Sequence, residues 1–145
     1  MSKIKIRKYI ESDIVLVDNL VKNILFEIFN SRPERIEELE NIKLFLVVED
    51  GGRVVGTIAL IEKSSDFVVK RLYVDKNYRN KGLAQKLYNK VEDFARKNKI
   101  KRLKLSTTPE MKSAIAFYNK NGFNEISRNE DKNQIFFEKE LKWIL

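Results

Sequence analysis

Two residue types that supply much of enzyme chemistry, cysteine and histidine, do not occur in this sequence of 145 residues. Without cysteine the chain has no disulfide framework, no thiol nucleophile and no cysteine-based zinc site. Without histidine it has no Ser-His-Asp triad, no imidazole base and no HExxH metal site. Catalysis by this chain would therefore have to use carboxylates, lysines, tyrosines, backbone dipoles or a cofactor.

Long hydrophobic runs are also missing. The longest unbroken run, Leu44 to Val48, is far too short to span a bilayer. Near the N-terminus, Lys3, Lys5, Arg7 and Lys8 interrupt the apolar residues, so no export signal is recognisable there. We therefore expect a cytoplasmic protein with no membrane partner.

Length and charge limit the partners further. The chain fits a single domain over residues 1–145, and no repeat or proline-rich linker divides it. The 29 Lys and Arg residues exceed the 21 Asp and Glu residues, which gives a formal charge of +8. Such a balance suits nucleic acid, an anionic membrane surface or a phosphate-rich cofactor, but it also suits a solvated lysine-rich surface. The placement of the charges has to decide between these interpretations.

Hydrophobic periodicity predicts an alternation of strands and helices. We expect one helix to begin after Ser12 as its cap, and a short second helix to begin at Pro33. Further helices are predicted over about 83–98 and from Pro109, the latter closed by Gly122. Predicted strands cover residues 3–9, 43–49, 53–62, 67–74, 101–108, 123–129 and 134–141. Three consecutive strands followed by β-α-β units imply a mixed sheet with helices on its faces.

The strongest local signal is a turn between the strand that ends in L-Y-V and an amphipathic helix. Gly82 would let a ligand approach the backbone there, where the amides from about Arg79 to Ala84 have no helical partner. Unpaired donors at the positive end of a helix dipole form a phosphate site, and Arg79, Lys81 and Lys86 add charge. The alternative is that Gly82 only relieves a tight turn. Neither G-x-G-x-x-G nor G-K-[ST] occurs, which excludes the usual dinucleotide and nucleoside triphosphate loops.

Two motifs in the second half of the chain together resemble a known family. The segment R-L-Y-V at 71–74 precedes a turn of the pattern [QR]-x-x-G-x-[GA], formed by Arg79, Asn80, Lys81, Gly82, Leu83 and Ala84. A second motif, A-x-x-F-Y-x-x-x-G-F, is formed by Ala114, Phe117, Tyr118, Gly122 and Phe123. Both are similar to signatures of the GNAT superfamily of acetyl-CoA-dependent N-acetyltransferases. The resemblance implies an α/β fold with a central mixed, mostly antiparallel sheet of six or seven strands, flanked by about four helices.

The resemblance also implies an activity and site residues. The amides of the turn 79–84 would hold the pyrophosphate of acetyl-CoA, and the main chain of Leu72, Tyr73 and Val74 would bind its pantetheine arm. An amide directed at the thioester oxygen stabilises the oxyanion that forms when an amine attacks. Tyr118 would protonate the departing thiolate, although its alternative interpretation is a core aromatic. The implied protein is an acyltransferase with acetyl-CoA as cosubstrate and no metal.

The general base is less well defined by this resemblance. Many relatives carry a glutamate on the strand before L-Y-V, where this chain has Val68 and Val69. The remaining candidates for the base are a water molecule, Glu62, Asp66 and Glu27. Many relatives also have an asparagine at the position of Met111, so one polar contact to the arm is missing here.

The acceptor implied by the resemblance is a primary amine of a small molecule or peptide, which attacks directly in a ternary complex. Phe26, Phe29 and Arg32 are candidates for its site, although a core stripe explains the two phenylalanines as well. The resemblance leaves both a monomer and a homodimer open.

Two other functions stay open at this level. The basic run Arg96–Lys104 would suit a nucleic-acid or ribosome-associated module, but no aromatic residues alternate with its charges to stack on bases. Nucleic acid is therefore not the expected partner. The missing strand glutamate would also suit a non-catalytic sensor that binds an acyl-CoA.

Overall fold

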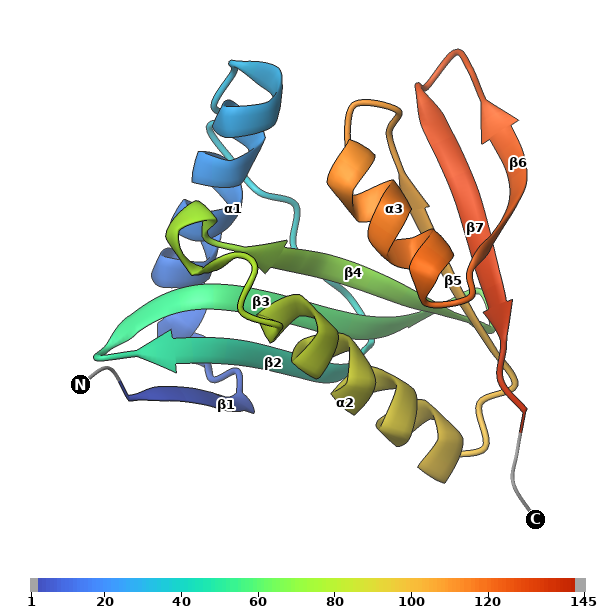
Figure 1. Ribbon diagram of the computed structural model, residues 1–145, viewed down its shortest axis with the longest axis horizontal. Coiled ribbons are helices and arrows are strands. Elements are labelled where there is room, and N and C mark those ends of the chain that lie inside the picture. The colour runs from blue at the N-terminus through green and yellow to red at the C-terminus, as the bar shows by residue number, and fades with distance from the viewer. Residues whose placement is uncertain (1–2, 143–145) are drawn as a thin grey trace.

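The computed structural model describes residues 3–142, which form a seven-stranded sheet with helices on both faces (Figure 1). The strands lie in the order β1-β2-β3-β4-β5-β7-β6, and all neighbours are antiparallel except β4 and β5. Their bounds are β1 Ile4–Lys8, β2 Ile42–Asp50, β3 Arg53–Lys63, β4 Asp66–Val74, β5 Arg102–Thr107, β6 Asn124–Asn129 and β7 Gln134–Glu140. The helices are α1 Ile14–Phe29, α2 Leu83–Lys97 and α3 Lys112–Lys120, with short 3-10 turns at Glu11–Asp13 and Lys76–Tyr78. The mixed, mostly antiparallel sheet is confirmed.

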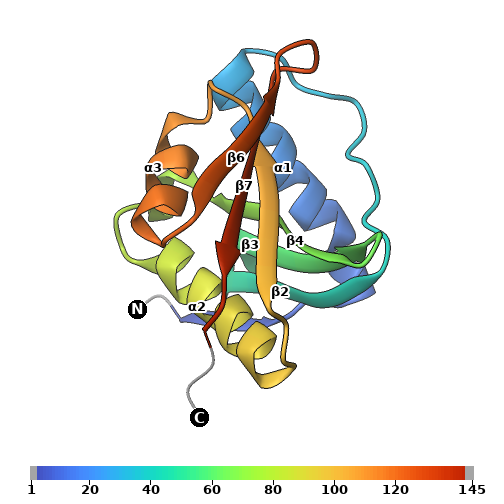
Figure 2. The same ribbon diagram turned by 90° about the vertical axis from the view of Figure 1, so that its right-hand side faces the viewer.

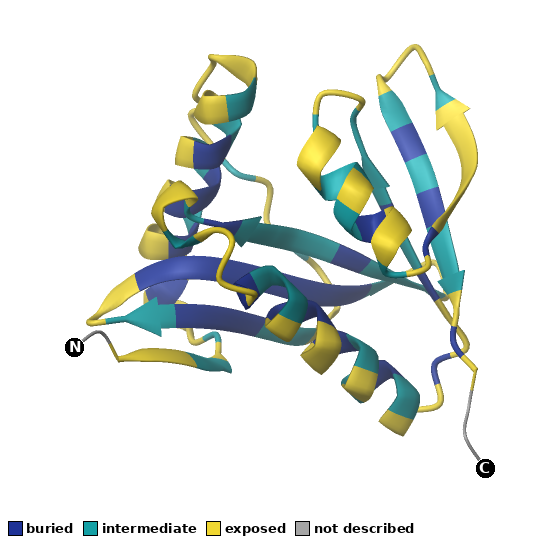
Figure 3. Ribbon diagram, in the orientation of Figure 1, coloured by how far each residue is buried: buried dark blue, intermediate teal, exposed yellow. Residues whose placement is uncertain are grey.

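Two hydrophobic clusters cover opposite faces of the sheet. Successive residues of a strand point to opposite faces, so Leu46 and Val48 pack with α2 in one cluster while Val47 packs with α1 in the other. The buried stripe of α2 lies against the sheet and its charged side faces outward (Figure 3). The period-3.6 pattern of α1 and α2 was therefore a correct guide to the faces that the two helices bury.

Two details of the first helical region differ from the prediction. No helix follows Pro33 among the described residues, so three α-helices are described instead of about four. The segment after Pro33 is strongly charged and only Ile36 packs on the α1 cluster, which leaves a helix there without an apolar face to bury. Ser12 does not cap α1. It lies inside the 3-10 turn, where the Asp13 carboxylate accepts hydrogen bonds from the Ile10 amide and the Arg7 guanidinium, all at 2.8 Å.

The sheet is split between its two halves. β4 and β5 pair only at Phe67 with Leu103 and at Val68 with Lys104. From that point the two strands diverge, and the half made of β5, β6, β7 and α3 turns away from the half made of β1 to β4 (Figures 1 and 2). The edge of β4 that faces β5 therefore has no strand partner from Val69 onward.

A β-bulge bends β4 beside this split. Thr57 of β3 pairs with Tyr73 and Ala59 pairs with Lys70, so two residues of β4, Arg71 and Leu72, lie opposite one residue of β3. Arg71 has a φ of +59°, an unfavourable conformation for a residue with a side chain. The buried Thr57 hydroxyl donates to the Arg71 carbonyl at 2.6 Å and holds the bulge in place.

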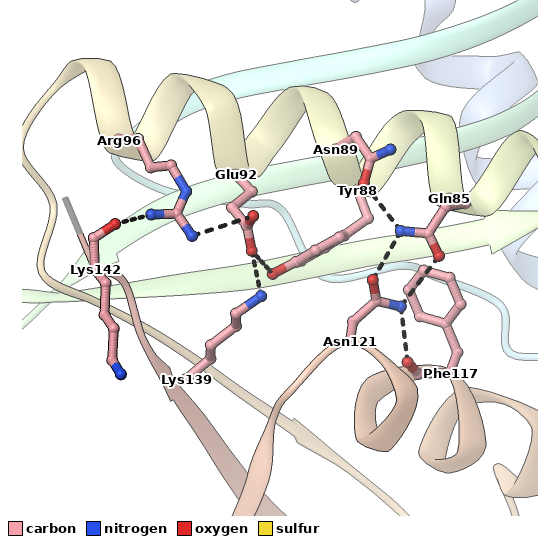
Figure 4. Close-up of polar contacts among 9 residues, drawn as sticks. All are labelled: Gln85, Tyr88, Asn89, Glu92, Arg96, Phe117, Asn121, Lys139 and Lys142. Carbon is pink, nitrogen blue, oxygen red and sulfur yellow. Dashed lines mark hydrogen bonds and ion pairs between the residues drawn. The ribbon is translucent and has the colours of Figure 1, made fainter. Parts of the chain in front are cut away.

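Polar side chains fasten α2 to the second half of the sheet (Figure 4). Glu92 of α2 accepts a hydrogen bond from the Tyr88 hydroxyl at 2.8 Å and pairs with Lys139 of β7 and with Arg96. Nearby, Gln85 of α2 and Asn121 at the end of α3 exchange two amide hydrogen bonds, of 2.7 and 3.2 Å. These contacts set the position of α3 relative to α2.

The end of α3 is closed by backbone hydrogen bonds. Gly122 has a φ of +90°, its amide donates to the Asn119 carbonyl, and the Phe123 amide donates to the Tyr118 carbonyl. This is a Schellman motif, which favours glycine at that position. The prediction that Gly122 closes this helix is confirmed.

The Glu92 network predicts a pH-dependent stability. Burial raises the pKa of Glu92, but hydrogen bonds from Lys139 and Tyr88 outweigh it and leave the pKa below its ordinary value. A depressed pKa stabilises the fold above the ordinary glutamate pKa, about 4.3, and this contribution is lost as the pH falls through the folded-state pKa. Glu92→Gln should cost about 1–3 kcal/mol at pH 7 in urea titrations, because Lys139 loses its partner, and the difference should shrink below about pH 4.

Glu125→Gln is the matched control, because it removes an exposed ion pair with Arg128 on β6. It should change the free energy of unfolding little at any pH. Equal effects of the two substitutions would contradict the role given to the Glu92 network.

Candidate active site

One pocket lies where the split sheet meets the start of α2. It has a volume of about 520 Å³ and is called the turn pocket here, because the turn after β4 forms one wall. Its lining comes from α1, β4, the turn, α2 and α3, and comprises Ile24, Glu27, Ile28, Leu72, Tyr73, Val74, Arg79, Asn80, Ala84, the residues 110–114, Phe117 and Tyr118. Most of the site residues predicted from the sequence therefore lie together.

Three predicted residues do not line the turn pocket with the others. Leu83 has a buried side chain in the core beneath α2, so only its backbone could serve a ligand. The Lys81 ammonium lies 5.4 Å from the centre of the Tyr78 ring. Gly82 has no side chain, and its contribution is conformational.

The turn carries the geometry of an anion site. Gly82 is the N-cap of α2 with a φ of +77°, and Asn80 has a φ of +61°. No side chain caps the helix, so the first amides of α2 are available as donors at the positive end of the helix dipole. A Cβ added at Gly82 would meet nothing within 4 Å, so the positive φ, rather than crowding by the protein, favours glycine there.

Arg79 crosses from the turn to α1. Its guanidinium donates to both oxygens of Glu27, at 2.5 and 3.0 Å, and its Nε donates to the Val74 carbonyl at 3.0 Å. The hydrogen bonds from Arg79 hold the pKa of Glu27 below its ordinary value. Glu27 thus positions Arg79, and as an ion-paired carboxylate of low pKa it is a poor general base.

A second, smaller pocket lies in the gap between β4 and β5. It has a volume of about 220 Å³ and is called the cleft pocket here. It shares Leu72, Tyr73, Met111, Ala114 and Tyr118 with the turn pocket. The two pockets therefore meet at one common wall, which a ligand in either pocket would touch.

Tyr118 stands in this common wall. It is 8% exposed and packs edge-on against Phe117 and Phe123. Its hydroxyl makes no hydrogen bond to the residues that the structure describes. Burial raises the pKa of Tyr118 and nearby Tyr73 adds to the effect, so the phenol is protonated at neutral pH and able to donate.

The remaining candidates from the sequence lie elsewhere, with one exception. Glu62 pairs with Lys43 at 3.2 Å, Asp66 pairs with Lys104 at 3.3 Å, and neither lines the two pockets. Of the acceptor-site candidates, Phe29 lines the cleft pocket, Phe26 is 51% exposed outside both pockets, and Arg32 contacts Asn19 and Asn23 of α1.

Sequence reasoning missed the polar side of the cleft pocket. Lys70 and Arg71 lie within β4 next to the bulge, and Ser106, Thr107, Thr108 and Gln134 complete the lining. The run of hydroxyl residues at the end of β5 was visible in the sequence as S-T-T. The sequence did not show that these residues line a pocket, because their position depends on how far β5 diverges from β4.

The basic run is partly neutralised within the fold. Arg96 contacts Glu92 and the Lys142 carbonyl, Arg102 pairs with Glu138 and Glu140, and Lys104 pairs with Asp66. These contacts account for part of the positive charge without any ligand. Within residues 3–142, no helix has the length and apolar character required to cross a bilayer.

The split sheet, the turn and the two pockets with a shared wall define a GNAT-like α/β domain. The profile of the Acetyltransferase (GNAT) family matches residues 16–123, and the chain belongs to that family. A GNAT-family acetyltransferase of Staphylococcus aureus Mu50 superposes with a TM-score of 0.84 at 28% identity, covering 97% of this chain and 100% of that one.

Other acetyltransferases and related proteins are similar as well. The PaiA N-acetyltransferase of Thermoplasma acidophilum, solved in complex with coenzyme A, has the same fold with a TM-score of 0.80 at 19% identity, over 96% of this chain and 99% of that one. The N-acetylaspartate synthetase of Xenopus tropicalis is 39% identical over 77 residues, which are 52% of this chain and 28% of that protein. The matched segments span 28% to 52% of the lengths of five such curated relatives.

The geometry of the turn predicts the effect of Gly82→Ala. Alanine at a positive φ costs about 1 kcal/mol and would shift the turn amides. We expect coenzyme A to bind roughly tenfold more weakly in calorimetry, a change of about 1.4 kcal/mol. Gly52→Ala is the matched control, because Gly52 has a φ of +84° and equally open surroundings in the β2–β3 hairpin. It should cost similar stability and leave coenzyme A binding unchanged; an equal loss of binding in both variants would refute a local role for Gly82.

Proposed function

We propose that this protein is an N-acetyltransferase that transfers an acetyl group from acetyl-CoA to a primary amine. The amine attacks the thioester directly while both substrates are bound, and residues 1–145 act as one catalytic domain. The observation that carries the proposal is the position of Tyr118 in the wall shared by the turn pocket and the cleft pocket. Family membership supports the transfer of an acetyl group.

The turn pocket is the proposed site of acetyl-CoA. The amides of residues 79–84 and the charges of Arg79 and Lys81 suit its pyrophosphate, because they combine helix-terminal donors with cations. The unpaired edge of β4 at Leu72, Tyr73 and Val74 suits the amide-containing arm, which can add to a strand edge by main-chain hydrogen bonds. The volume of about 520 Å³ is within the usual range of cofactor sites. The PaiA enzyme solved with coenzyme A supports the use of an acyl-CoA.

Tyr118 is the proposed general acid. A protonated phenol beside the sulfur can donate its proton to the departing thiolate as the amide bond forms. Burial keeps that proton on Tyr118 at neutral pH, and no hydrogen bond from the described residues competes for its hydroxyl. A water molecule is the proposed base for the ammonium of the acceptor, because no carboxylate of the described residues lines the cleft pocket.

The proposal predicts that Tyr118→Phe lowers kcat by about 10²-fold or more, because the thiolate then leaves without an acid. The KM for acetyl-CoA should change little. The measurement is release of free coenzyme A with a panel of amines, alongside calorimetry with coenzyme A.

Tyr88→Phe is the matched control for this test. It removes a buried phenol whose hydroxyl donates to Glu92 and which lies outside both pockets. At a temperature where both variants are folded, it should leave kcat unchanged. Tight binding of acetyl-CoA without turnover of any amine would overturn the proposal in favour of a sensor.

A further inference from the structure

The cleft pocket is lined by basic, hydroxyl and amide groups but by no acidic ones among the described residues. Its polar lining consists of two cations, Lys70 and Arg71, two phenols, and the hydroxyl and amide groups of Ser106, Thr107, Thr108 and Gln134. Among the described residues, none that lines it carries a carboxylate. The chain has 21 acidic residues, and none of those that the structure describes lines this pocket.

Lys70 is the most informative member of this set. Its side chain is partly buried, and it makes no ion pair with any residue between 3 and 142. Burial, with Arg71 and Lys63 nearby, lowers the pKa of Lys70, and the opposite effect of the Glu37 charge does not outweigh them. A desolvated cation without a partner is costly, and an anionic ligand in the pocket would offset that cost.

Arg71 is held next to Lys70 by the bulge of β4. Its carbonyl accepts from the buried Thr57 hydroxyl at 2.6 Å, and its guanidinium donates to the Glu37 carbonyl. Arg71 also lines another pocket, between α1 and the segment 34–39, together with Glu34, Glu37 and Glu38, so its guanidinium extends towards acidic residues on that side. Lys70 is therefore the cation of the cleft pocket on which the inference rests.

Thr108 supplies an independent observation. Its Oγ1 is buried, lies in a residue that lines the cleft pocket, and has no hydrogen-bond partner among the described residues. Buried hydroxyls in proteins nearly always have a partner, and rotation of the Thr108 side chain towards a ligand in the pocket would give this one a partner. A carboxylate oxygen would accept from this hydroxyl and from the Lys70 ammonium.

The size of the pocket limits the ligand. Its volume of about 220 Å³ lies below the range of about 300–1,000 Å³ that drug-sized ligands occupy. A molecule of the size of an amino acid suits this volume better than a long polyamine. A polyamine or a lysine side chain would also bring more positive charge to a wall that already carries the Lys70 cation and no carboxylate of the described residues.

We propose that the acceptor is a small amine that carries a carboxylate, such as a free amino acid, and that Lys70 and Thr108 bind this carboxylate in the cleft pocket. The inference rests on the proposed function, because it takes the cleft pocket as the acceptor side of the site. Lys70 and Thr108 are thus specificity-determining residues for the acceptor, while Tyr118 serves any amine.

The test compares amino acids with their own amides, which keep the α-amine and remove the carboxylate. With the parent protein and acetyl-CoA, kcat/KM should be at least tenfold higher for the preferred acid than for its amide. Lys70→Gln should reduce this ratio towards one, and Thr108→Val should reduce it less. Lys90→Gln, the same charge change on an exposed residue of α2, is the matched control and should preserve the ratio.

The outcomes separate this inference from the function on which it rests. Equal or better use of amides and polyamines by the parent protein would overturn the carboxylate site and leave the acetyltransferase intact. If no amine turns over, the proposed function fails, and calorimetry of the same amino acids against the protein–coenzyme A complex decides the inference. The inference is supported if the amino acids bind more tightly than their amides and if Lys70→Gln weakens the binding of the acids. Equal affinities in these comparisons would overturn it.

Discussion

The arrangement of the site depends on one constraint, namely that β4 and β5 pair over only two residue pairs before they diverge. Parallel strands that stayed paired would use up the facing edge of β4 and close the gap that holds the cleft pocket. Because they diverge, one side of β4 remains available for main-chain hydrogen bonds while its other side is anchored on β3. The polar contacts of α2 with the end of α3 and with β7 then hold the second half of the sheet against α2.

The two pockets differ in the charged and polar groups that line them. Backbone dipoles and cations gather at the turn, where a polyanion would bind, and cations with hydroxyls gather in the cleft pocket. Outside the cleft pocket, acidic residues pair with cations, as Glu27 in the turn pocket does with Arg79 and Glu92 does with Lys139. Under the proposed function, the absence of histidine and cysteine is no obstacle, because direct acetyl transfer can use a phenol and backbone donors and needs no protein nucleophile.

Local signals in the sequence were sufficient for the parts that are local in the fold. The glycine at 82, with the strand before it and the amphipathic helix after it, identified the β4–turn–α2 unit, and Gly122 identified the end of α3. Contacts between distant segments were beyond reach: Glu27 and Arg79 are 52 positions apart, and nothing in either neighbourhood indicates the pair. Lys70 and Thr108 were missed for the same reason, since only the bulge and the divergence of β5 bring them to one pocket. The prediction of a helix after Pro33 was wrong because a residue that favours a helix start is not sufficient when the segment has no apolar face to bury.

The amide pair between Gln85 and Asn121 has a consequence for the choice of acyl donor. Gln85 lies in the first turn of α2, close to the uncapped amides of that helix, and Asn121 follows the helix that carries Tyr118. The two hydrogen bonds between Gln85 and Asn121 hold the start of α2 at a fixed distance from the Tyr118 phenol. Under the proposed function, a thioester presented on a carrier arm much shorter or longer than pantetheine would bind at the turn yet miss the acid.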